Sequence, residues 1–512
     1  MAGGWRAMIA IAMAGLMQLL DVSVVNIALP DIERDLGARF NELRWVIDAN
    51  ALSLAATVLI YGTLGDRLGR RRVFTAGMIA FSALSLACGL AWSAISLDIL
   101  RAFQGLAAAA MLATALALIG ATYSGRERNT ALAVWGVGIG VALAIGPLLG
   151  GVLVETVGWR AVFIVNVPIG LLSAVLVLKG VPESRDPSAT GRPDIAGLLA
   201  LAGSMTMILL ALFRGSAAGW GSPLILGLIG GSILLLLVFI AIETSVAQPM
   251  LDLSLFRRPS TTGAFVATLA IAASFFALWT FLIFYIQNAL GYSALQTGLI
   301  LLPMSLSSLV GAVIAGRLAN HVPLRILTAS ALAIAGGGML LLRGIDVNSD
   351  WPALLLGGVL AELGTGALNP FVGAVALGAA PRSRSGMAAG LNATGRYLGI
   401  AVGVAGLGTI LESHISGRLT TLLGSEESEA LTGVVSTGNI EGAAASVPIG
   451  SQAEVAEAAD LAFVSGMNEI LLVGAMIAFI GGALALLLIR KRDMHREVAE
   501  ESGAGSLEPV AA

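Results

Sequence analysis

The sequence predicts an all-α membrane protein that crosses the bilayer fourteen times, and three observations lead to this prediction. Hydrophobic residues make up 57% of the 512 residues and charged residues only 12%, which is outside the usual range of soluble domains. The apolar residues gather in runs of about 20, the length of a transmembrane helix. Arginine-rich turns separate several of these runs, as is typical of loops on the cytoplasmic side.

Fourteen apolar runs are long enough to be candidate spans. In chain order they lie near residues 7-29, 44-64, 73-92, 97-122, 131-154, 161-178, 195-213, 222-243, 263-287, 296-318, 326-343, 352-378, 386-410 and 466-489. With the N-terminus in the cytoplasm, most Lys and Arg residues fall in cytoplasmic segments. This asymmetry supports the number of spans and places both termini inside the cell.

Two breaks in composition divide the chain. Residues 181–194 are rich in proline and charge, and a second, basic break at 249–262 precedes the ninth span. We expect an N-terminal six-helix bundle (1-182), a linker with two inserted helices (183-262), a C-terminal six-helix bundle (263-493) and a cytoplasmic tail (494-512). The loop 412-463 is expected outside the cell as a mobile acidic segment, with a vestibule that attracts cations as the alternative.

The composition argues against a nucleotide-hydrolysing site and a metal site, and we expect no enzyme activity. Lys179 and Lys491 are the only lysines, and neither lies in a phosphate-binding loop, so ATP hydrolysis of that type is excluded. Cys88 is the single cysteine, and the three histidines are scattered, so neither a disulfide nor a metal site is supported. We expect no metal and no cofactor.

A basic turn follows the second span: Gly62-Thr63-Leu64-Gly65-Asp66-Arg67-Leu68-Gly69-Arg70-Arg71-Arg72. Its arginines place it at a membrane surface, and its glycines let two helices approach closely. Asp66 could cap the helix that begins near Val73, and it could also face the positive N-terminus of a helix from another part of the molecule. A simple basic anchor for a helical hairpin is the alternative, although it explains neither the glycine spacing nor the acid.

Charged residues inside a span are costly, so each is a functional candidate. Asp21 lies in the outer half of the first span, and Arg101 lies one turn into the fourth, where its permanent charge can stabilise a carboxylate. Asp98 shares the face of Arg101, and Asp48 enters the second span at a similar depth. We infer that the four residues converge. A structural role for Asp21 and interfacial positions for Asp48 and Asp98 are the alternatives.

The C-terminal half offers two further charged candidates near mid-membrane. Glu362 in the twelfth span and Arg396 in the thirteenth are placed to form a pair. If Arg396 does not neutralise Glu362, this acid becomes a second proton or cation site. The thirteenth span starts on the cytoplasmic side, so its N-terminus near Ser385 is a candidate partner for Asp66.

Small residues and aromatic residues suggest where helices meet and where a substrate binds. The fifth span contains Gly146, Pro147, Gly150 and Gly151, which permit a bend and close helix contact, with generic packing as the alternative. A substrate cavity is only weakly indicated, and its candidate residues are Asn26, Gln104, Trp279 and Tyr285. Aromatic side chains suit flat or cationic substrates, although their ordinary role is packing.

Four of these stretches resemble motifs of the major facilitator superfamily. The basic turn is similar to the signature loop Gly-x-Leu-x-Asp-Arg-x-Gly-Arg-Arg, and Arg101 to Gly105 resembles the buried motif Arg-x-x-Gln-Gly. The run from Leu20 to Pro30 resembles the first-helix motif of the fourteen-helix drug/proton antiporters, with Ser23 where Thr is usual. The run from Gly146 to Gly151 resembles the core of the antiporter motif, whose upstream glycine is replaced by Ala142.

The resemblance implies roles for these residues. It assigns proton and cation handling to Asp21, and the release and closure of the two halves to a conformational latch centred on Asp66. The latch residues are Gly62, Gly65, Asp66, Arg67, Gly69, Arg70 and Arg71.

The resemblance also implies a fold and a function. The fold is that of the major facilitators with six, two inserted and six helices, and the function is proton-coupled efflux of drugs or antibiotics by alternating access, as in the EmrB/QacA type. The expected partners are a small lipophilic substrate, protons and the lipid bilayer. A cationic substrate is one option, and no nucleic acid is expected. The protein would act as a monomer in the cell membrane of a bacterium. Export of an endogenous metabolite or amino acid and a non-transporting membrane sensor or scaffold are the competing hypotheses.

Overall fold

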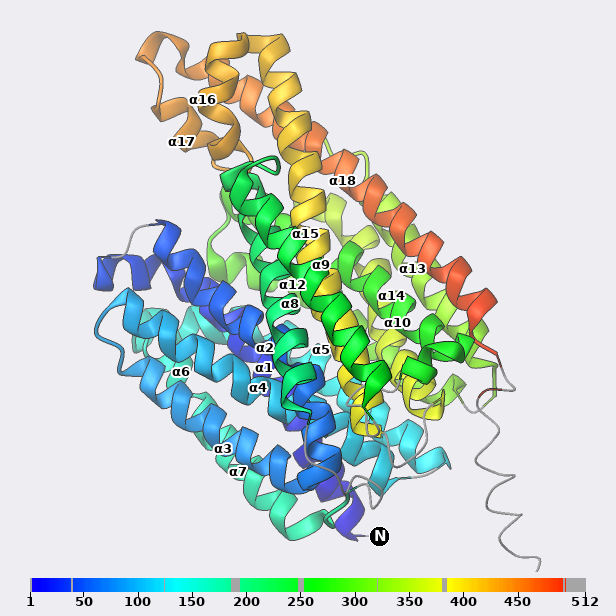
Figure 1. Cartoon of the computed structure of the whole chain (residues 1–512). Helices are drawn as coiled ribbons and strands as arrows, with labels where there is room; N and C mark the ends of the chain where they lie inside the picture. The colour runs from blue at the N-terminus through cyan, green and yellow to red at the C-terminus, as the bar shows by residue number, and fades with distance from the viewer. Residues whose placement is uncertain are drawn as a thin grey trace, which may run out of the picture.

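The computed structural model describes residues 2–37, 40–123, 125–185, 194–246, 253–319, 321–379, 385–490 and 493, and within these ranges the chain forms helices and turns (Figure 1). Twelve helices in the described part are long and apolar enough to cross a membrane. Two more, α5 (Gly125–Thr156) and α8 (Ile195–Ala218), contain shorter apolar stretches. The predicted all-helical membrane fold is therefore confirmed, whereas the count of fourteen spans stays a prediction that depends on α5 and α8.

The N-terminal unit consists of α1 (Ala2–Leu36), α2 (Phe40–Leu68), α3 (Arg70–Gly89), α4 (Ala94–Thr122), α5, α6 (Ala161–Ile164) and α7 (Asn166–Gly180). Local signals fix some helix ends. Ser93 begins α4 with a capping box, in which its hydroxyl accepts a hydrogen bond from the backbone N–H of Ser96. We call the end where α1 begins and α2 finishes the Asp66 side.

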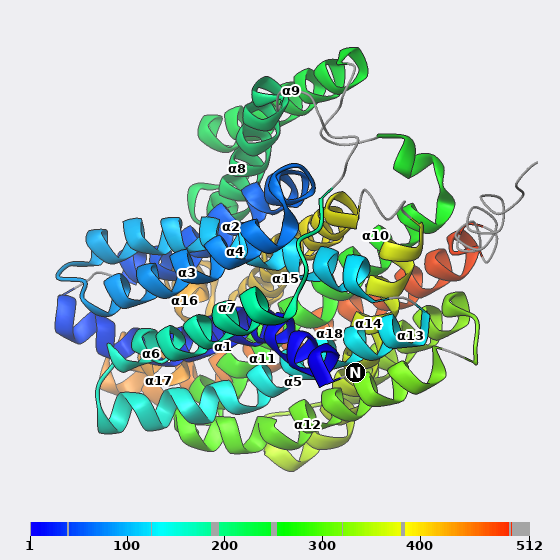
Figure 2. The same cartoon turned by 90° about the horizontal axis from the view of Figure 1, so that it is seen from below.

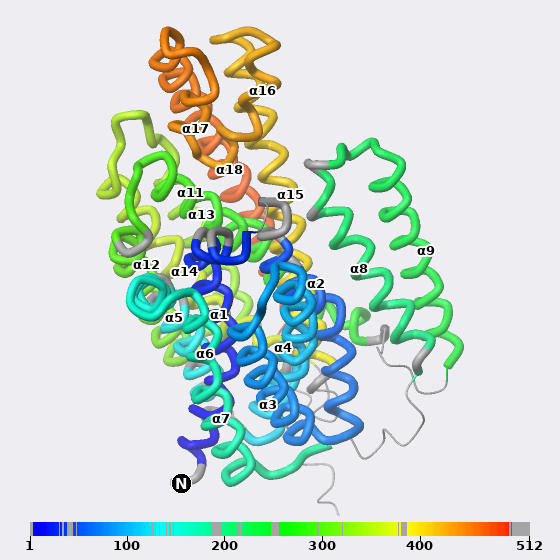
Figure 3. Tube along the Cα trace, turned by 90° about the vertical axis from the view of Figure 1, so that its left-hand side faces the viewer, coloured from blue at the N-terminus to red at the C-terminus, as the bar shows by residue number. Residues whose placement is uncertain are grey.

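The inserted helices α8 and α9 (Pro223–Ser245) lie side by side at the edge of the bundle (Figures 2 and 3). The hydroxyl groups of Ser204 and Ser232 bond to each other's backbone carbonyl groups at 2.9 Å and hold the two helices together. The leucine-rich faces of α9 are exposed. The two helices therefore form a separate hairpin beside the N-terminal and C-terminal units.

The C-terminal unit begins with one continuous span in which α-helical and π-helical turns alternate. The elements of this unit are η1 (Leu253–Arg257), α10 (Pro259–Ile271), η2 (Ala272–Phe276), α11 (Ala277–Phe284), η3 (Tyr285–Ala289), α12 (Ala294–Leu318), α13 (Leu324–Leu342), α14 (Trp351–Ala379), α15 (Ser385–Leu423), α16 (Ser425–Val435), α17 (Ile440–Ala445), η5 (Ile449–Ser451) and α18 (Gln452–Leu488). Both η2 and η3 are π-helical turns, which widen a helix locally. One apolar core connects these helices.

The N-terminal and C-terminal units repeat the same packing. In the N-terminal unit α4 packs on α2 and α3, and α7 packs on α1 and α3. In the C-terminal unit α14 packs on α12 and α13, and α18 packs on α10 and α13. The units meet through α5 against α12 and through α2 against α15. Helix α14 therefore occupies the place in its unit that α4 occupies in the first unit.

Residues 412–463 are mainly helical, which corrects the expectation of a loop. Helix α15 continues to Leu423, α16 and α17 follow, and α18 begins at Gln452, so that these helices stand above the rest of the bundle at the top of Figure 1. Apolar side chains one helical turn apart, such as Ile415 with Leu419 and Leu431 with Val435, are buried in the core of this segment. We call this end of the molecule the α16 side.

Candidate functional site

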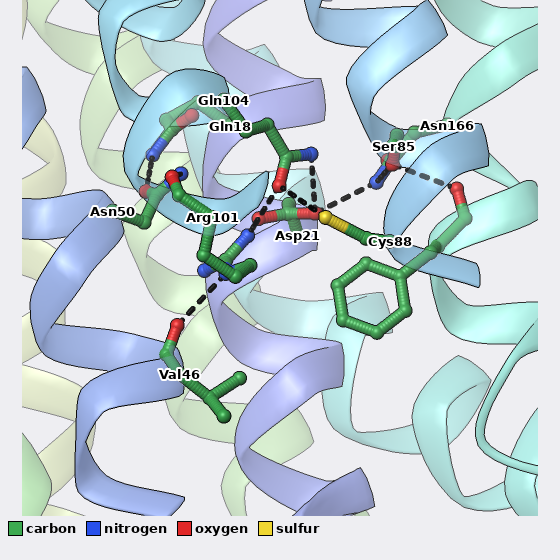
Figure 4. Close-up of polar contacts among 10 residues, drawn as sticks. Gln18, Asp21, Val46, Asn50, Ser85, Cys88, Arg101, Gln104 and Asn166 are labelled. Carbon is green, nitrogen blue, oxygen red and sulfur yellow. Dashed lines mark hydrogen bonds and ion pairs between the residues drawn. The ribbon is translucent and has the colours of Figure 1, made fainter. Parts of the chain in front are cut away.

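Asp21 lies at the centre of a buried polar cluster formed by α1, α4 and α7 (Figure 4). Its side chain is 0% exposed. Its Oδ2 atom lies 2.5 Å from Nη1 of Arg101, while Oδ1 accepts hydrogen bonds from Nδ2 of Asn166 at 2.8 Å and Nε2 of Gln104 at 3.4 Å. One cation and two amide donors thus face this carboxyl group.

Arg101 is 1% exposed, and several N–H groups of its guanidinium donate hydrogen bonds. Its Nη1 donates to Oε1 of Gln104 at 2.7 Å, and its Nε donates to the carbonyl oxygen of Val46 on α2 at 2.8 Å. The guanidinium carbon lies 5.9 Å from the centre of the Phe163 ring. Removing either member of such a buried ion pair leaves an uncompensated charge. The two side chains are therefore expected to depend on each other for their stability within the cluster.

Four members of this cluster were not predicted from the sequence. Asn166 also donates to the hydroxyl of Ser85 at 3.1 Å. Gln18 donates to Oδ1 of Asn50 at 3.3 Å, and Asn50 donates to the carbonyl oxygen of Arg101 at 3.5 Å. Uncharged amides and hydroxyls do not stand out from the hydropathy of a span. The signal that could have found one of them is an asparagine inside the otherwise apolar run 161–178.

The structure tests part of the prediction that Asp21, Asp48, Asp98 and Arg101 converge. Asp21 and Arg101 meet, as predicted. Asp98 lies three residues before Arg101 on α4 and is half-buried. The backbone of Asp48 belongs to α2, but its side chain lies outside the described residues. The convergence of all four stays a prediction.

The glycine-rich part of α5 packs tightly on α1 within one turn of the buried acid. A Cβ atom at Gly146 would collide with the side chain of Ser23, and one at Gly150 would be in tight contact with α1. Gly151 is also buried in α5, while the side chain of Pro147 lies outside the described residues. Close packing between the two helices therefore requires glycine at position 146.

Replacing this glycine is expected to destabilise the N-terminal unit. We expect Gly146→Ala to cost about 1–3 kcal/mol, because the added methyl group overpacks a closed interface, and Ser23→Gly to restore most of the loss by removing the colliding atoms. Thermal unfolding of the purified protein in detergent measures both effects. Gly227→Ala on α9, where a Cβ atom meets open space, is the control. An unchanged melting temperature in Gly146→Ala would contradict the packing argument.

Asp66 joins the N-terminal and C-terminal units. Its Oδ2 accepts a hydrogen bond from the backbone N–H of Met387 in the first turn of α15 at 3.0 Å, and its Oδ1 accepts one from Nε of Arg70 at 2.7 Å. First-turn N–H groups have no partner within their helix, so a negative charge is favoured there. The predicted contact with the N-terminus of another helix is thus confirmed. Asp66 also contacts the following helix through the side chain of Arg70, the first residue of α3, and its role as a cap of that helix stays a prediction.

The remaining latch residues surround this contact: Gly62, Gly65 and Arg67 in α2, Gly69 between the helices and Arg71 in α3. A Cβ atom at Gly65 would collide with Thr114, and Gly69 has a φ of +113°, which favours glycine. From the sequence, Glu183 was expected only to be part of the linker. In the structure its Oε1 accepts a hydrogen bond from the backbone N–H of Arg71 at 3.0 Å. The segment after α7 therefore fixes the start of α3.

Glu362 and Arg396 do not form the predicted pair. Nη2 of Arg396 donates to Oδ1 of Asn369 at 2.6 Å, and its guanidinium carbon lies 5.6 Å from the centre of the Phe276 ring. Glu362 is 0% exposed on α14. The pairing failed as a prediction because Arg396 finds a neutral amide and an aromatic face instead, which the positions of two charges in a sequence do not reveal.

The four weakly indicated cavity residues lie in different surroundings. Asn26 is exposed on α1, and Gln104 belongs to the Asp21 cluster. Tyr285 is 1% exposed in the core of the C-terminal unit, where it stacks on Phe463 with ring centres 6.3 Å apart. Trp279 lines a shallow apolar cleft between η2, α11, α13 and α18. The residues therefore do not form one cavity wall in this conformation.

The sequence matches the family model of the Major Facilitator Superfamily over residues 11–404. The chain belongs to the major facilitator superfamily. Members of this superfamily are transporters, so the chain is a transporter and not an enzyme. The motifs that predicted this membership are those that carry the Asp21 cluster and the Asp66 contact.

This major facilitator resembles several proteins named for drug resistance. It is 31% identical over 97% of its length to the tetracenomycin C resistance and export protein of Streptomyces glaucescens, of which it covers 94%. It is 35% identical over 79% of its length to the puromycin resistance protein pur8 of Streptomyces alboniger, of which it covers 81%. Such relatives are consistent with the drug/proton antiporter branch of the superfamily.

Solved structures support the fold of this major facilitator. The human organic anion transporter MFSD10 aligns with a TM-score of 0.59 at 14% identity, over 93% of this chain and 99% of that one. An inward-facing bacterial homologue of the human lysosomal transporter Spinster aligns with a TM-score of 0.56 at 17% identity, over 96% and 98% of the two chains. At these identities the likeness concerns the fold alone.

Proposed function

We propose that this protein exports drugs or antibiotics from the cell in exchange for protons, by alternating access. The observation that carries the proposal is the buried ion pair of Asp21 and Arg101, in a chain similar over nearly its whole length to an antibiotic export protein. A buried acid that is stabilised only by its partners can couple proton binding to helix movement. The energy source is the proton gradient, without a cofactor.

The proposed topology has fourteen spans, with both termini and the Asp66 side in the cytoplasm and the α16 side outside. In this arrangement a proton from outside binds Asp21, which weakens its attraction for Arg101 and its hydrogen bond with Asn166 on α7. The helices α1, α4 and α7 are then free to rearrange while substrate leaves outward. The Asp66 contact with α15 holds the cytoplasmic side closed during this step, and its release opens that side again.

The proposed substrate is small and lipophilic, with lipophilic cations as the first class to test. Transport is proposed to occur as a monomer in a bacterial cell membrane. The relatives named for tetracenomycin C and puromycin resistance motivate the choice of drugs over metabolites.

Accumulation of a fluorescent lipophilic cation in bacterial cells tests this proposal. Cells that express the protein should accumulate less dye than cells with an empty vector, and a protonophore should remove the difference. An unchanged accumulation across cationic, neutral and anionic drugs, together with export of an endogenous metabolite or amino acid, would replace drug efflux by metabolite export. Transport that persists with the protonophore would contradict proton coupling.

A further inference from the structure

Glu362 is a buried acid that the proposed mechanism does not use. It lies about midway along the membrane-spanning part of α14 and is 0% exposed. Neither of its carboxyl oxygen atoms takes part in a well-formed hydrogen bond within the described part of the chain. A carboxylate in such a place is an unusual feature, because charge without a partner is strongly disfavoured in a protein interior within a membrane.

The surroundings of Glu362 are hydroxyl groups and close-packed helices. The side chain of Ser308 on α12 lies beside its carboxyl group, and Ser305, one turn earlier on α12, has a buried hydroxyl without a hydrogen-bond partner in the described residues. Cβ atoms at Gly358 and Gly366, one turn to each side of Glu362, would collide with Met304 and Ser308 of α12. The α12–α14 interface is therefore closed around this acid, and hydroxyl groups are its polar neighbours.

The cations on the neighbouring helices are occupied or distant. Arg396 on α15 is bound to Asn369, and Arg101 on α4 is bound to Asp21. The other charged or titratable described side chains on the helices that pack against α14 are Glu127, Arg128 and Glu155 at the ends of α5, Asp98 near the start of α4, Arg317 and Arg325 at the Asp66-side ends of α12 and α13, and Tyr397, Glu412, His414 and Arg418 on α15. Glu362 thus differs from Asp21, which has an arginine and two amides.

We propose that Glu362 is a second proton-binding site, which carries a proton while Asp66 is in contact with α15. The uncharged carboxyl group can share a hydrogen bond with the hydroxyl of Ser308, whereas the charged form would have no cation beside it among the described side chains. Asp21 is paired with Arg101 in the same conformation, so the two acids lie in opposite surroundings. Their helices, α4 with Arg101 and α14 with Glu362, occupy equivalent places in the two units. The proposal rests on the proposed proton coupling and adds a second carrier to it.

The position of α14 connects this site to the movement of the two units. Gly136 on α5 packs against Ala312 of α12 and Pro370 of α14, so that α5 of the first unit lies across the two helices that enclose Glu362. Movement of α5 away from α12 and α14 would open the interface that encloses Glu362. The proton of Glu362 is therefore released in a conformation other than the present one.

Infrared spectroscopy tests the protonation of Glu362 without depending on transport. The full chain in lipid nanodiscs is measured at neutral pH as wild type, Glu362→Gln and Asp21→Asn. We expect a carboxylic acid C=O band in the wild type and in Asp21→Asn, and its loss in Glu362→Gln. The same acid band in the wild type and in Glu362→Gln, or no acid band in the wild type, would overturn the proposal.

A second measurement keeps the test valid if Glu362→Gln fails to fold. Labelling wild-type glutamate with ¹³C at the side-chain carboxyl carbon shifts the C=O band of a protonated glutamic acid and leaves that of an aspartic acid in place. A band that moves with the label supports the proposal, and one that stays contradicts it. A transport assay of Glu362→Gln then separates the two claims. A protonated Glu362 in a protein that moves no protons with its substrate would leave the site standing and contradict the proposed antiport.

Discussion

Asp21→Asn is expected to abolish proton-driven efflux. The substitution keeps the size of the side chain but removes the charge that balances the buried guanidinium of Arg101, 2.5 Å away. Breaking a buried pair in this way costs about 3–5 kcal/mol, because one charge is left unpaired. The variant cannot take up a proton at this position, so dye accumulation in cells should rise to the level of the empty vector.

The same helix offers a matched control. Asp35 lies beyond the membrane-spanning part of α1 and pairs with Arg160 at 2.6 Å, but the two side chains are 46% and 43% exposed. Hydrogen bonds from Arg160 and Trp159 hold the pKa of Asp35 below its usual value, so this acid stays ionised and carries no proton at neutral pH. Asp35→Asn should therefore transport as the wild type does. Equal efflux by Asp21→Asn and Asp35→Asn would contradict the role of the buried acid.

Asp66→Ala is expected to shift the protein toward conformations that are open on the Asp66 side. The substitution removes the acceptor for the N–H of Met387 and the partner of Arg70, which is 3% exposed. A charge placed at a helix N-terminus in a partly buried position contributes up to ~2 kcal/mol, which corresponds to a change of roughly 30-fold in the ratio of the two states. Distances between spin labels at positions 72 and 325, on α3 and α13, measure this ratio by pulsed electron resonance.

A neighbouring substitution separates the latch from a general effect of charge. The Nε atom of Arg72 lies 3.6 Å from Glu183, but its side chain is 75% exposed. With labels placed at positions 68 and 325 instead, Arg72→Ala should leave the distance distribution unchanged. Equal shifts in Asp66→Ala and Arg72→Ala would mean that the turn acts through its net charge, and no shift in either would remove the latch from the mechanism.

The parts of the site that depend on strong local signals could be predicted from the sequence. Long apolar runs have few alternatives to membrane helices, because a chain in lipid must satisfy its backbone internally. A charge inside such a run needs a partner, and this requirement led from Asp21 to Arg101. The contact between Asp66 and α15 also followed from physical reasoning, since an acid on one surface and a helix N-terminus on the same surface attract each other.

Contacts that are not marked by charge or composition could not be predicted. Asn166 donates directly to Asp21, yet an asparagine in a helix gives no indication of the direction in which it points. The segment 412–463 was expected to be mobile because of its glycine, serine and glutamate content. Its leucines, such as Leu419 and Leu431, follow helical spacing, and a core large enough to bury them decides the structure. Arg396 was assigned to the wrong partner for the same reason, since three-dimensional proximity to Asn369 depends on how α14 and α15 pack.

Proton uptake into proteoliposomes tests the central claim most directly. The purified protein is reconstituted with a pH-sensitive dye inside the vesicles, and a substrate found in the cell assay is added on one side. The account predicts that a substrate gradient drives protons in the opposite direction in the wild type and in Asp35→Asn, and drives none in Asp21→Asn. Proton movement of equal size in Asp21→Asn, or substrate movement without protons in the wild type, would contradict it.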